Sequence, residues 1–336
     1  MRPNSVERYE PFNARADRSP SLLECMMPRR KLLTCAAVLA VLTAAPATAS
    51  ATVSAPPESP HGAKAAVAAN RPPDPDAPKR GRVEGARPFV PNARNAKAVQ
   101  RFRDLHRSRV RRQQIHHFWG VEPAAGTHDG LMATQSVDTS YKVSYSADFT
   151  YTPTIKAASS CMEITTVYSQ VLGNEIWAWD WCGGNGPSVE LKLDASFVQT
   201  YTTPVNGHPA YNVQLVRTDA SRNSWSAYLY NYKTSSWSLF YSKSGTDTSE
   251  LKYGWDIFEI YATRNPSTGT AYYCSEAKNV VFESSSIKLR KNNQWTPASP
   301  SDSPWQPSAN PNPSDYLCPT LKFVRAGAND HWIVRQ

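Results

Sequence analysis

The chain has little of what most hydrolases and transferases need. Only seven of its 336 residues are histidines, and after residue 129 only His208, in a Gly-His-Pro turn, and His331 remain. Both are expected at the surface, whereas a serine-hydrolase triad requires a histidine base. There is also no Gly-x-Ser-x-Gly elbow and no glycine-rich phosphate loop. Carboxylates and aromatic side chains are left as the groups able to carry a function.

Cysteine is scarce, with six residues in the whole chain. Cys25 and Cys35 belong to a predicted export leader, which leaves four in the rest of the protein: Cys161, Cys182, Cys274 and Cys318. An even number in a secreted domain indicates two disulfides with three possible pairings, of which we favour the two between sequence neighbours, Cys161–Cys182 and Cys274–Cys318. No pair has the spacing of a zinc site, and we expect no metal and no cofactor.

Long apolar runs are also missing. The run 32–45 follows the basic segment 27–31 and is too short to span a bilayer, and small residues follow it at 47–51. This order is typical of an export signal, so residues 1–49 are predicted to be a leader, with the true start possibly at Met27. The expectation is a secreted protein without a stable membrane anchor.

Charge is distributed unevenly. Residues 1–129 contain 21 Lys and Arg against 11 Asp and Glu, whereas the rest of the chain contains 16 against 17. The basic character therefore belongs to the front of the chain, and a nucleic-acid partner is not expected.

The front segment reads as linker and pro-segment. Residues 50–93 are rich in Pro and Ala and lack periodicity, which predicts a disordered linker. Residues 95–118 place apolar side chains among arginines at helical spacing, which predicts a basic amphipathic helix. Together, 50–129 suggest a pro-segment lying across an acidic cleft, or alternatively a solvated helix that only spaces the domain.

The sequence of the domain 130–336 has the pattern of a β protein. Ten short runs typical of strands are separated by turns, which predicts an antiparallel β-sandwich or jelly-roll-like fold. The predicted strands are Lys142–Thr150, Met162–Val171, Glu175–Trp181, Val189–Leu193, Phe197–Tyr201, Tyr211–Arg217, Trp225–Tyr232, Trp237–Tyr241, Asp256–Ala262 and Val280–Lys288.

One run concentrates aromatic rings on one face. Side chains alternate along a strand, so Glu175, Trp177, Trp179 and Trp181 share a face. This stripe is either the sandwich core or the aromatic floor of a substrate groove, with chemistry at Glu175. Tyr228, Tyr230 and Tyr232 form a second such stripe with the same two interpretations.

Buried carboxyls are the best candidates for acid–base chemistry, because burial raises a Glu pKa toward working pH. Glu175 leads the tryptophan face, and Glu283 shares a face with Val281. Glu259 lies on one face with Trp255, Ile257 and Tyr261.

The order of motifs resembles the neprosin family over about residues 140–290. The resemblance rests on Met162-Glu-Ile-Thr-Thr-Val, Glu175-Ile-Trp-Ala-Trp, Phe197-Val-Gln-Thr, Tyr211-Asn-Val-Gln-Leu-Val-Arg-Thr-Asp with Asn223-Ser-Trp, Tyr253-Gly-Trp, and Val280-Val-Phe-Glu-Ser-Ser-Ser-Ile. It implies a double β-sandwich glutamic peptidase with a pro-segment, cutting near proline at acidic pH. Glu175 and Glu283 would be its carboxyl pair, with Glu259 or Glu276 as alternatives to the second.

Two functions follow, both with a polymeric substrate. A glutamic endopeptidase predicts that Glu175 and Glu283 converge in one cleft. A non-catalytic carbohydrate-binding module predicts exposed, coplanar rings. For either function, the predicted substrate-binding aromatic residues are Trp177, Trp179, Trp181, Tyr228, Tyr230 and Trp255.

Overall fold

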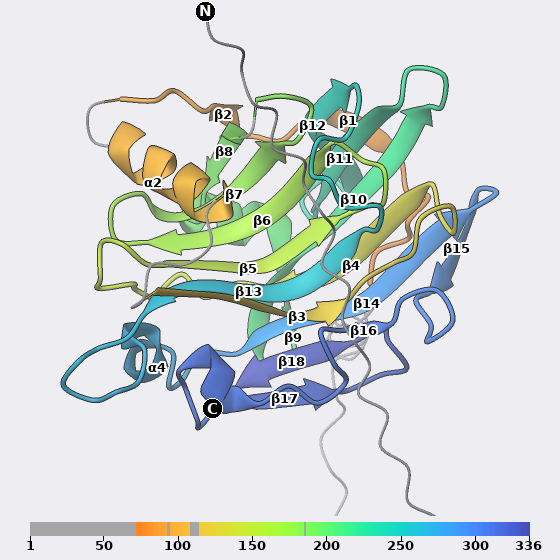
Figure 1. Cartoon of the computed structure of the whole chain (residues 1–336). Coiled ribbons are helices and arrows are strands. Elements are labelled where there is room, and N and C mark those ends of the chain that lie inside the picture. The colour runs from red at the N-terminus through yellow and green to blue at the C-terminus, as the bar shows by residue number, and fades with distance from the viewer. Residues whose placement is uncertain (1–71, 93–94, 108–113, 185) are drawn as a thin grey trace, which may run out of the picture. The chain divides into compact units, whose positions relative to one another are not determined.

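Two β-sheets, packed face to face, form the body of the described part of the protein (Figure 1). The computed structural model describes residues 72–336 except 93–94, 108–113 and 185, so the predicted leader lies outside the described residues. The all-β sandwich expected from the sequence is confirmed. No helix within the described ranges has the length and apolarity needed to cross a membrane.

The first sheet has ten strands. Across the sheet they run β1 (Lys79–Arg82), β12 (Ser236–Ser244), β11 (Ser224–Asn231), β10 (His208–Asp219), β4 (Gly130–Ser136), β14 (Phe282–Lys291), β18 (Trp332–Arg335) and β17 (Lys322–Arg325), with β15 (Gln294–Pro297) on β14 and β9 (Thr202–Val205) on β10. Its pairs are antiparallel except β1 with β12.

The second sheet has eight strands, all paired antiparallel. Their order is β16 (Trp305–Gln306), β3 (Gln114–Val121), β13 (Trp255–Thr263), β5 (Phe149–Lys156), β6 (Met162–Ser169), β7 (Gly173–Asp180), β8 (Gly186–Lys192) and β2 (Arg87–Pro88). The helices are α2 (Ala96–Arg107), α3 (Ala195–Tyr201), α4 (Tyr272–Glu276) and the 3₁₀-helix η1 (Pro313–Tyr316).

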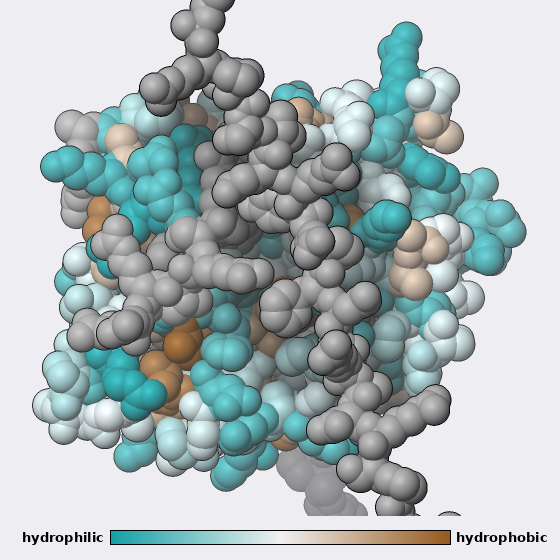
Figure 2. All heavy atoms as spheres, viewed as in Figure 1, coloured by the Kyte–Doolittle hydropathy of each residue, from teal (hydrophilic) through white to brown (hydrophobic). Residues whose placement is uncertain are grey.

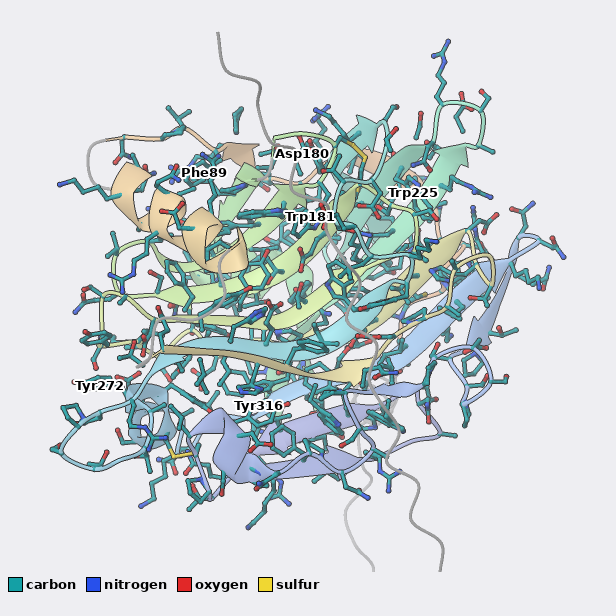
Figure 3. All side chains as sticks on the ribbon, in the orientation of Figure 1. Phe89, Asp180, Trp181, Trp225, Tyr272 and Tyr316 are labelled. Carbon is teal, nitrogen blue, oxygen red and sulfur yellow. A yellow bond between two sulfur atoms is a disulfide. The ribbon has the colours of Figure 1, made fainter. Side chains whose placement is uncertain are left out.

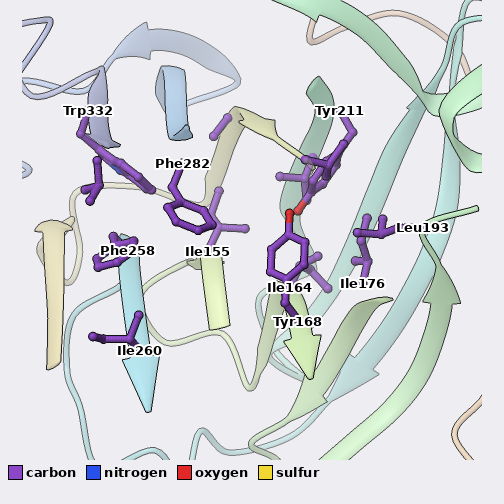
Figure 4. Packing of buried hydrophobic residues seen from close by; sticks show 14 of the residues in the cluster. Ile155, Ile164, Tyr168, Ile176, Leu193, Tyr211, Phe258, Ile260, Phe282 and Trp332 are labelled. Carbon is purple, nitrogen blue, oxygen red and sulfur yellow. The ribbon is translucent and has the colours of Figure 1, made fainter. Parts of the chain in front are cut away.

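The core lies between the sheets. Ile164 and Ile176 of the eight-stranded sheet and Val213 and Leu215 of the other sheet are fully buried in one apolar cluster, part of which Figure 4 shows. Because side chains alternate along a strand, the residues between them point to the outer faces.

Helix α2 covers part of the outer face of the eight-stranded sheet (Figure 1). Ala98 and Phe102 of this helix join a second apolar cluster with sheet residues, and the ring of Phe102 is completely buried. Figure 2 shows a mostly hydrophilic surface on this side of the molecule, with a small hydrophobic patch exposed below α2.

Both disulfides pair as the sequence favoured. Cys161–Cys182 joins the start of β6 to the end of β7. Cys274–Cys318 ties α4 to the segment after η1.

Several predicted elements differ from the structure. Residues 197–201 belong to helix α3 rather than a strand, because Asp194 caps the helix by accepting a hydrogen bond from the Phe197 amide. The predicted helix 95–118 ends at Arg107, and 114–121 form β3 along the whole of β13. Of the predicted linker, β1 and β2 each pair with a sheet. The sheets therefore begin well before residue 130.

Candidate active site

The tryptophan stripe of β7 faces away from the inter-sheet core. Ile176 and Ala178 point into the core, so Trp177, Trp179 and Trp181 lie on the outer face of the eight-stranded sheet. Trp177 and Trp179 are nonetheless buried, because α2 covers them. Trp181, at the end of β7 (Figure 3), is half-buried. The stripe is thus the floor of a surface groove that the chain's own N-terminal segment fills.

A cavity of about 720 Å³ opens on this face beside α2. Strands β3, β6, β7 and β13 and the loop before β13 supply its walls, and Arg103 of α2 lines it as well. It is lined by Arg103, His116, Phe118, Glu122, Glu163, Trp179, Trp181, Thr248, Ser249, Glu250, Leu251, Tyr253, Trp255, Ile257 and Glu259. Four of these residues are glutamates, so the cavity is acidic.

Glu163 of β6 is the most enclosed of these carboxyls, with an exposed fraction of 1%. Trp255 and Trp181 donate indole hydrogen bonds of 3.0 Å to its Oε1 and Oε2, and Thr154 donates to Oε1. Burial raises the pKa of Glu163 to about 7, and the negative charge of Glu259 adds to the rise, whereas the three hydrogen bonds oppose it. Below this pH the group holds its proton.

Glu259 of β13 has a different environment. His116 Nε2 lies 2.6 Å from Glu259 Oε1, and the Tyr261 hydroxyl donates to the same oxygen at 2.6 Å. The imidazole and the Tyr261 ring stack at 4.2 Å, which holds both groups in place. Burial raises the pKa of Tyr261 well above its usual value, so its hydroxyl stays a donor. Two groups thus contact the same oxygen of Glu259 and fix the position of its carboxyl.

Local sequence explains how β13 and the neighbouring strand β5 position Glu259 and Trp255. Glu259 and Trp255 share the outer face of β13 with Ile257 because side chains alternate along the strand. A Cβ on Gly254 would lie 2.3 Å from the Lys156 carbonyl oxygen, so only glycine allows the two strands to approach here. The Lys156 ammonium lies 4.8 Å from the centre of the Trp255 ring and pairs with Asp247 at 2.6 Å.

The structure does not bring Glu175 and Glu283 together. Glu175 lies on the outer face of β7 with Trp177, whose Nε1 donates to it at 2.8 Å. Glu283 follows the core residue Phe282 on β14, so it points to the outer face of the other sheet, where Asn206 and His331 each contact it at 2.6 Å. Both sheets separate the two carboxyls, and the expected convergence is not found.

The remaining predicted residues divide between sites. Trp181 and Trp255 line the acidic cavity, and Trp179 borders it. Tyr228 and Tyr230 are on β11 of the other sheet, where Lys79 lies over the Tyr228 ring at 5.4 Å. Glu276, the other alternative carboxyl, bonds Ser144 outside the cavity.

Sequence reasoning missed Glu163, His116 and the hydroxyl of Tyr261. Glu163 stands in the quoted motif Met162-Glu-Ile-Thr-Thr-Val, where it alternates with core residues Met162 and Ile164. Glu259 was an alternative for the second carboxyl, on the same face as Trp255 and Tyr261. The alternation of side chains along each strand was therefore the sequence signal that could have identified Glu163 and Glu259. His116 had none, because its segment was assigned to a helix.

Metal ligands do not gather at this site. Within the described part of the chain, no group of three or more His, Cys, Asp or Glu side chains is arranged to hold a metal ion.

Comparisons with known proteins give structural neighbours only. The chain is similar to scytalido-glutamic peptidase, solved with a peptide-based transition state analog, at 13% identity and a TM-score of 0.38 over 66% of this chain and 98% of that one. It is similar to SCP-B, a member of the Eqolisin family of peptidases solved with the tripeptide Ala-Ile-His, at 13% identity and a TM-score of 0.37, again over 66% and 98%.

Similarities this low carry no functional argument, so function has to come from the site. No protein-family model and no curated protein matches the chain, and the neprosin-like resemblance stays a prediction. Fold and site together define an all-β sandwich protein with a carboxyl pair, Glu163 and Glu259, in an aromatic groove.

Proposed function

We propose that this protein is a secreted endopeptidase of the glutamic type, with Glu163 and Glu259 as its catalytic carboxyls. The observation that carries the proposal is their shared cavity, in which burial and the Glu259 charge keep Glu163 protonated while donors surround Glu259. Two carboxyls in different environments can act as acid and base in one reaction.

In the proposed mechanism, the Glu259 carboxylate removes a proton from a water molecule while the water oxygen attacks the scissile carbonyl carbon. Glu163 donates its proton to the carbonyl oxygen, which stabilises the developing charge. When the tetrahedral intermediate collapses, the C–N bond breaks, the leaving nitrogen takes the proton from Glu259, and Glu163 recovers its own. His116 and Tyr261 hold Glu259 in position throughout.

Helix α2 would keep this full-length form inactive. Phe102 packs against the rings of Tyr151, Trp179 and Tyr261 at centroid distances of 4.9–5.2 Å, and Arg103 enters the acidic cavity. A peptide cannot occupy the groove while the helix is there. Cleavage of the segment, or protonation of the carboxyls that attract it, would release the helix.

The setting of the enzyme follows from its cysteines and from the resemblance. Two disulfides are typical of proteins that fold outside the reducing cytosol, which supports secretion through the predicted leader. The substrates would be proline-containing polypeptides, cut at acidic pH.

Digestion of a proline-rich protein at pH 3–7 tests the proposal. The full chain, first incubated at acidic pH to release helix α2, is compared with Glu163→Gln and Glu259→Gln, and with Glu283→Gln as a variant that removes a carboxyl on the other sheet. We expect the first two to lose activity by a factor of 10³ or more, as for removal of an acid or base with its electrostatic role. Full activity in either of them would exclude this pair.

Carbohydrate binding through the aromatic stripe is less well supported. It predicts exposed, coplanar rings, but Trp177 and Trp179 are buried, and the planes of Trp179 and Trp181 are inclined by 52°.

A further inference from the structure

A second cavity, of about 540 Å³, lies farther along the groove floor. Two carboxyls border it, Glu175 of β7 and Glu190 of β8, with exposed fractions of 4% and 8%. Glu190 pairs in register with Trp177, so both carboxyls lie on the same outer face as the proposed catalytic pair. The other charged residues that line this second cavity are Lys192, which is exposed beside Glu175, and Arg87 of β2.

The N-terminal segment already places a basic side chain there. Arg87 Nε lies 2.5 Å from Glu190 Oε1. Two residues on, the Phe89 amide donates to the Ser188 carbonyl at 2.9 Å, and the Phe89 ring meets the Trp177 ring edge-on at a centroid distance of 5.9 Å. Residues 87–89 thus lie as an extended peptide along β8, with one cationic and one aromatic side chain on the groove.

From this geometry we infer that Glu190 and Glu175 form a subsite for a basic residue, arginine above all, of a polypeptide substrate. In the present structure Arg87 occupies it in place of the substrate. When the segment that carries β2 and α2 leaves, Glu190 loses this partner and stays enclosed by the groove. A planar guanidinium can present two donors to the Glu190 carboxylate, a geometry that an ammonium does not match.

Strand geometry places this subsite relative to the proposed catalytic pair, on which its enzymatic role rests. Trp177, opposite Glu190, stands two residues before Trp179, which is opposite Glu163. With β8 two strands away from β6, the offset between Glu190 and Glu163 is roughly 12 Å. An extended peptide spans this with about three or four residues. The preferred arginine is therefore not the residue at the cut itself.

Peptide binding tests the subsite without catalysis. The probe is the peptide Ala-Arg-Pro-Phe-Val-Pro-Asn, residues 86–92, and its match carries citrulline in place of arginine. The host is the full chain with Arg87→Ser and Phe89→Ser, which weakens its own occupant. We expect the arginine peptide to bind at least fivefold tighter than the citrulline peptide, and Glu190→Gln to abolish the difference. Glu84→Gln, at an exposed carboxyl, should preserve it.

Equal binding of the two peptides, no binding of either, or a preference that survives Glu190→Gln would overturn the subsite. Turnover separates this from failure of the peptidase proposal. In peptides scanned with one arginine or citrulline, we expect the ratio of kcat/KM to peak about three or four residues from the cut and to collapse in Glu190→Gln. If neither peptide is cleaved while the binding preference holds, the peptidase proposal fails and the basic-residue subsite stands.

Discussion

At the scale of single residues, the environment of Glu163 sets the pH at which the proposed reaction can run. Its pKa of about 7 arises from burial and from Glu259, against three hydrogen bonds that favour the charged form. The acid must be protonated, so activity should decline as the pH rises through about 7.

Removing one donor tests this cause directly. Trp181→Phe keeps an aromatic ring but deletes the hydrogen bond to Glu163 Oε2. Because that bond stabilises the carboxylate, its loss should raise the pKa and move the alkaline limb of kcat/KM to higher pH, by about half a unit to one unit. Trp225→Phe, in the other sheet, should leave the limb unchanged. A shift to lower pH for Trp181→Phe would refute the assignment of Glu163 as the acid.

At the scale of elements, α2 is the part of the fold whose position controls access to the groove. Phe102 anchors the helix, because its ring is fully buried among aromatic residues of the sheet. Truncation of such a side chain in a core commonly lowers the free energy of unfolding by about 3–5 kcal/mol. Much of that burial depends on the helix staying docked. Weakening it should favour the undocked state.

Phe102→Ala should therefore raise the peptidase activity of the full chain tenfold or more before any processing, measured as initial rates on a proline-containing peptide. Gln100→Ala is the matched control, since Gln100 is exposed and bonds only Asp104 within the helix. If Phe102→Ala stays as inactive as the parent while the processed enzyme is active, the helix is not the block.

At the scale of the whole molecule, buried acids make stability depend on pH. Burial raises the pKa to about 7 for four carboxyls and to about 6 for Asp148, the four being Glu122, Glu163, Glu175 and Asp256. Each binds its proton more tightly in the folded than in the unfolded chain. Their contribution is complete below the unfolded pKa near 4 and is lost as the pH rises to 7.

His128 acts in the opposite direction. Burial lowers its pKa to about 4, so its contribution is lost as the pH falls from 6.5 toward 4. The four carboxyls outnumber it. We expect the urea midpoint of the full chain to fall between pH 5 and pH 7 and to level off above.

Asp256→Asn isolates one contributor. Asp256 lies in the core, where Trp332 Nε1 donates to it at 2.7 Å and Gln135 Nε2 donates at 3.3 Å. Without this titrating group, the slope of stability against pH should become shallower by up to about 1.4 kcal/mol per pH unit. Asp219→Asn, at the end of β10, should not change the slope in this range. A midpoint that rises from pH 5 to pH 7 would contradict the account.

Much of the architecture was predictable from local pattern. Alternating apolar residues identified most central strands, and the cysteine count with sequence proximity led to both disulfides. Two segments were predicted wrongly, the first because its strand partner is distant in sequence and the second because a local capping signal was missed. Residues 114–121 become a strand because β13 offers a full edge to pair with, and 197–201 become a helix because Asp194 caps it.

The sequence by itself determined which residues share a face, because alternation along a strand is a local property of the backbone: Glu175 with the tryptophans, and Glu259 with Trp255 and Tyr261. Only the tertiary structure decided which face lies inward and which carboxyls meet. Glu163 and Glu259 line the same cavity because β6 and β13 lie on either side of β5 in the sheet, a strand order that no local pattern contains. Glu175 and Glu283 are kept apart because each lies on the outer face of its own sheet, while the two sheets pack through their inner faces.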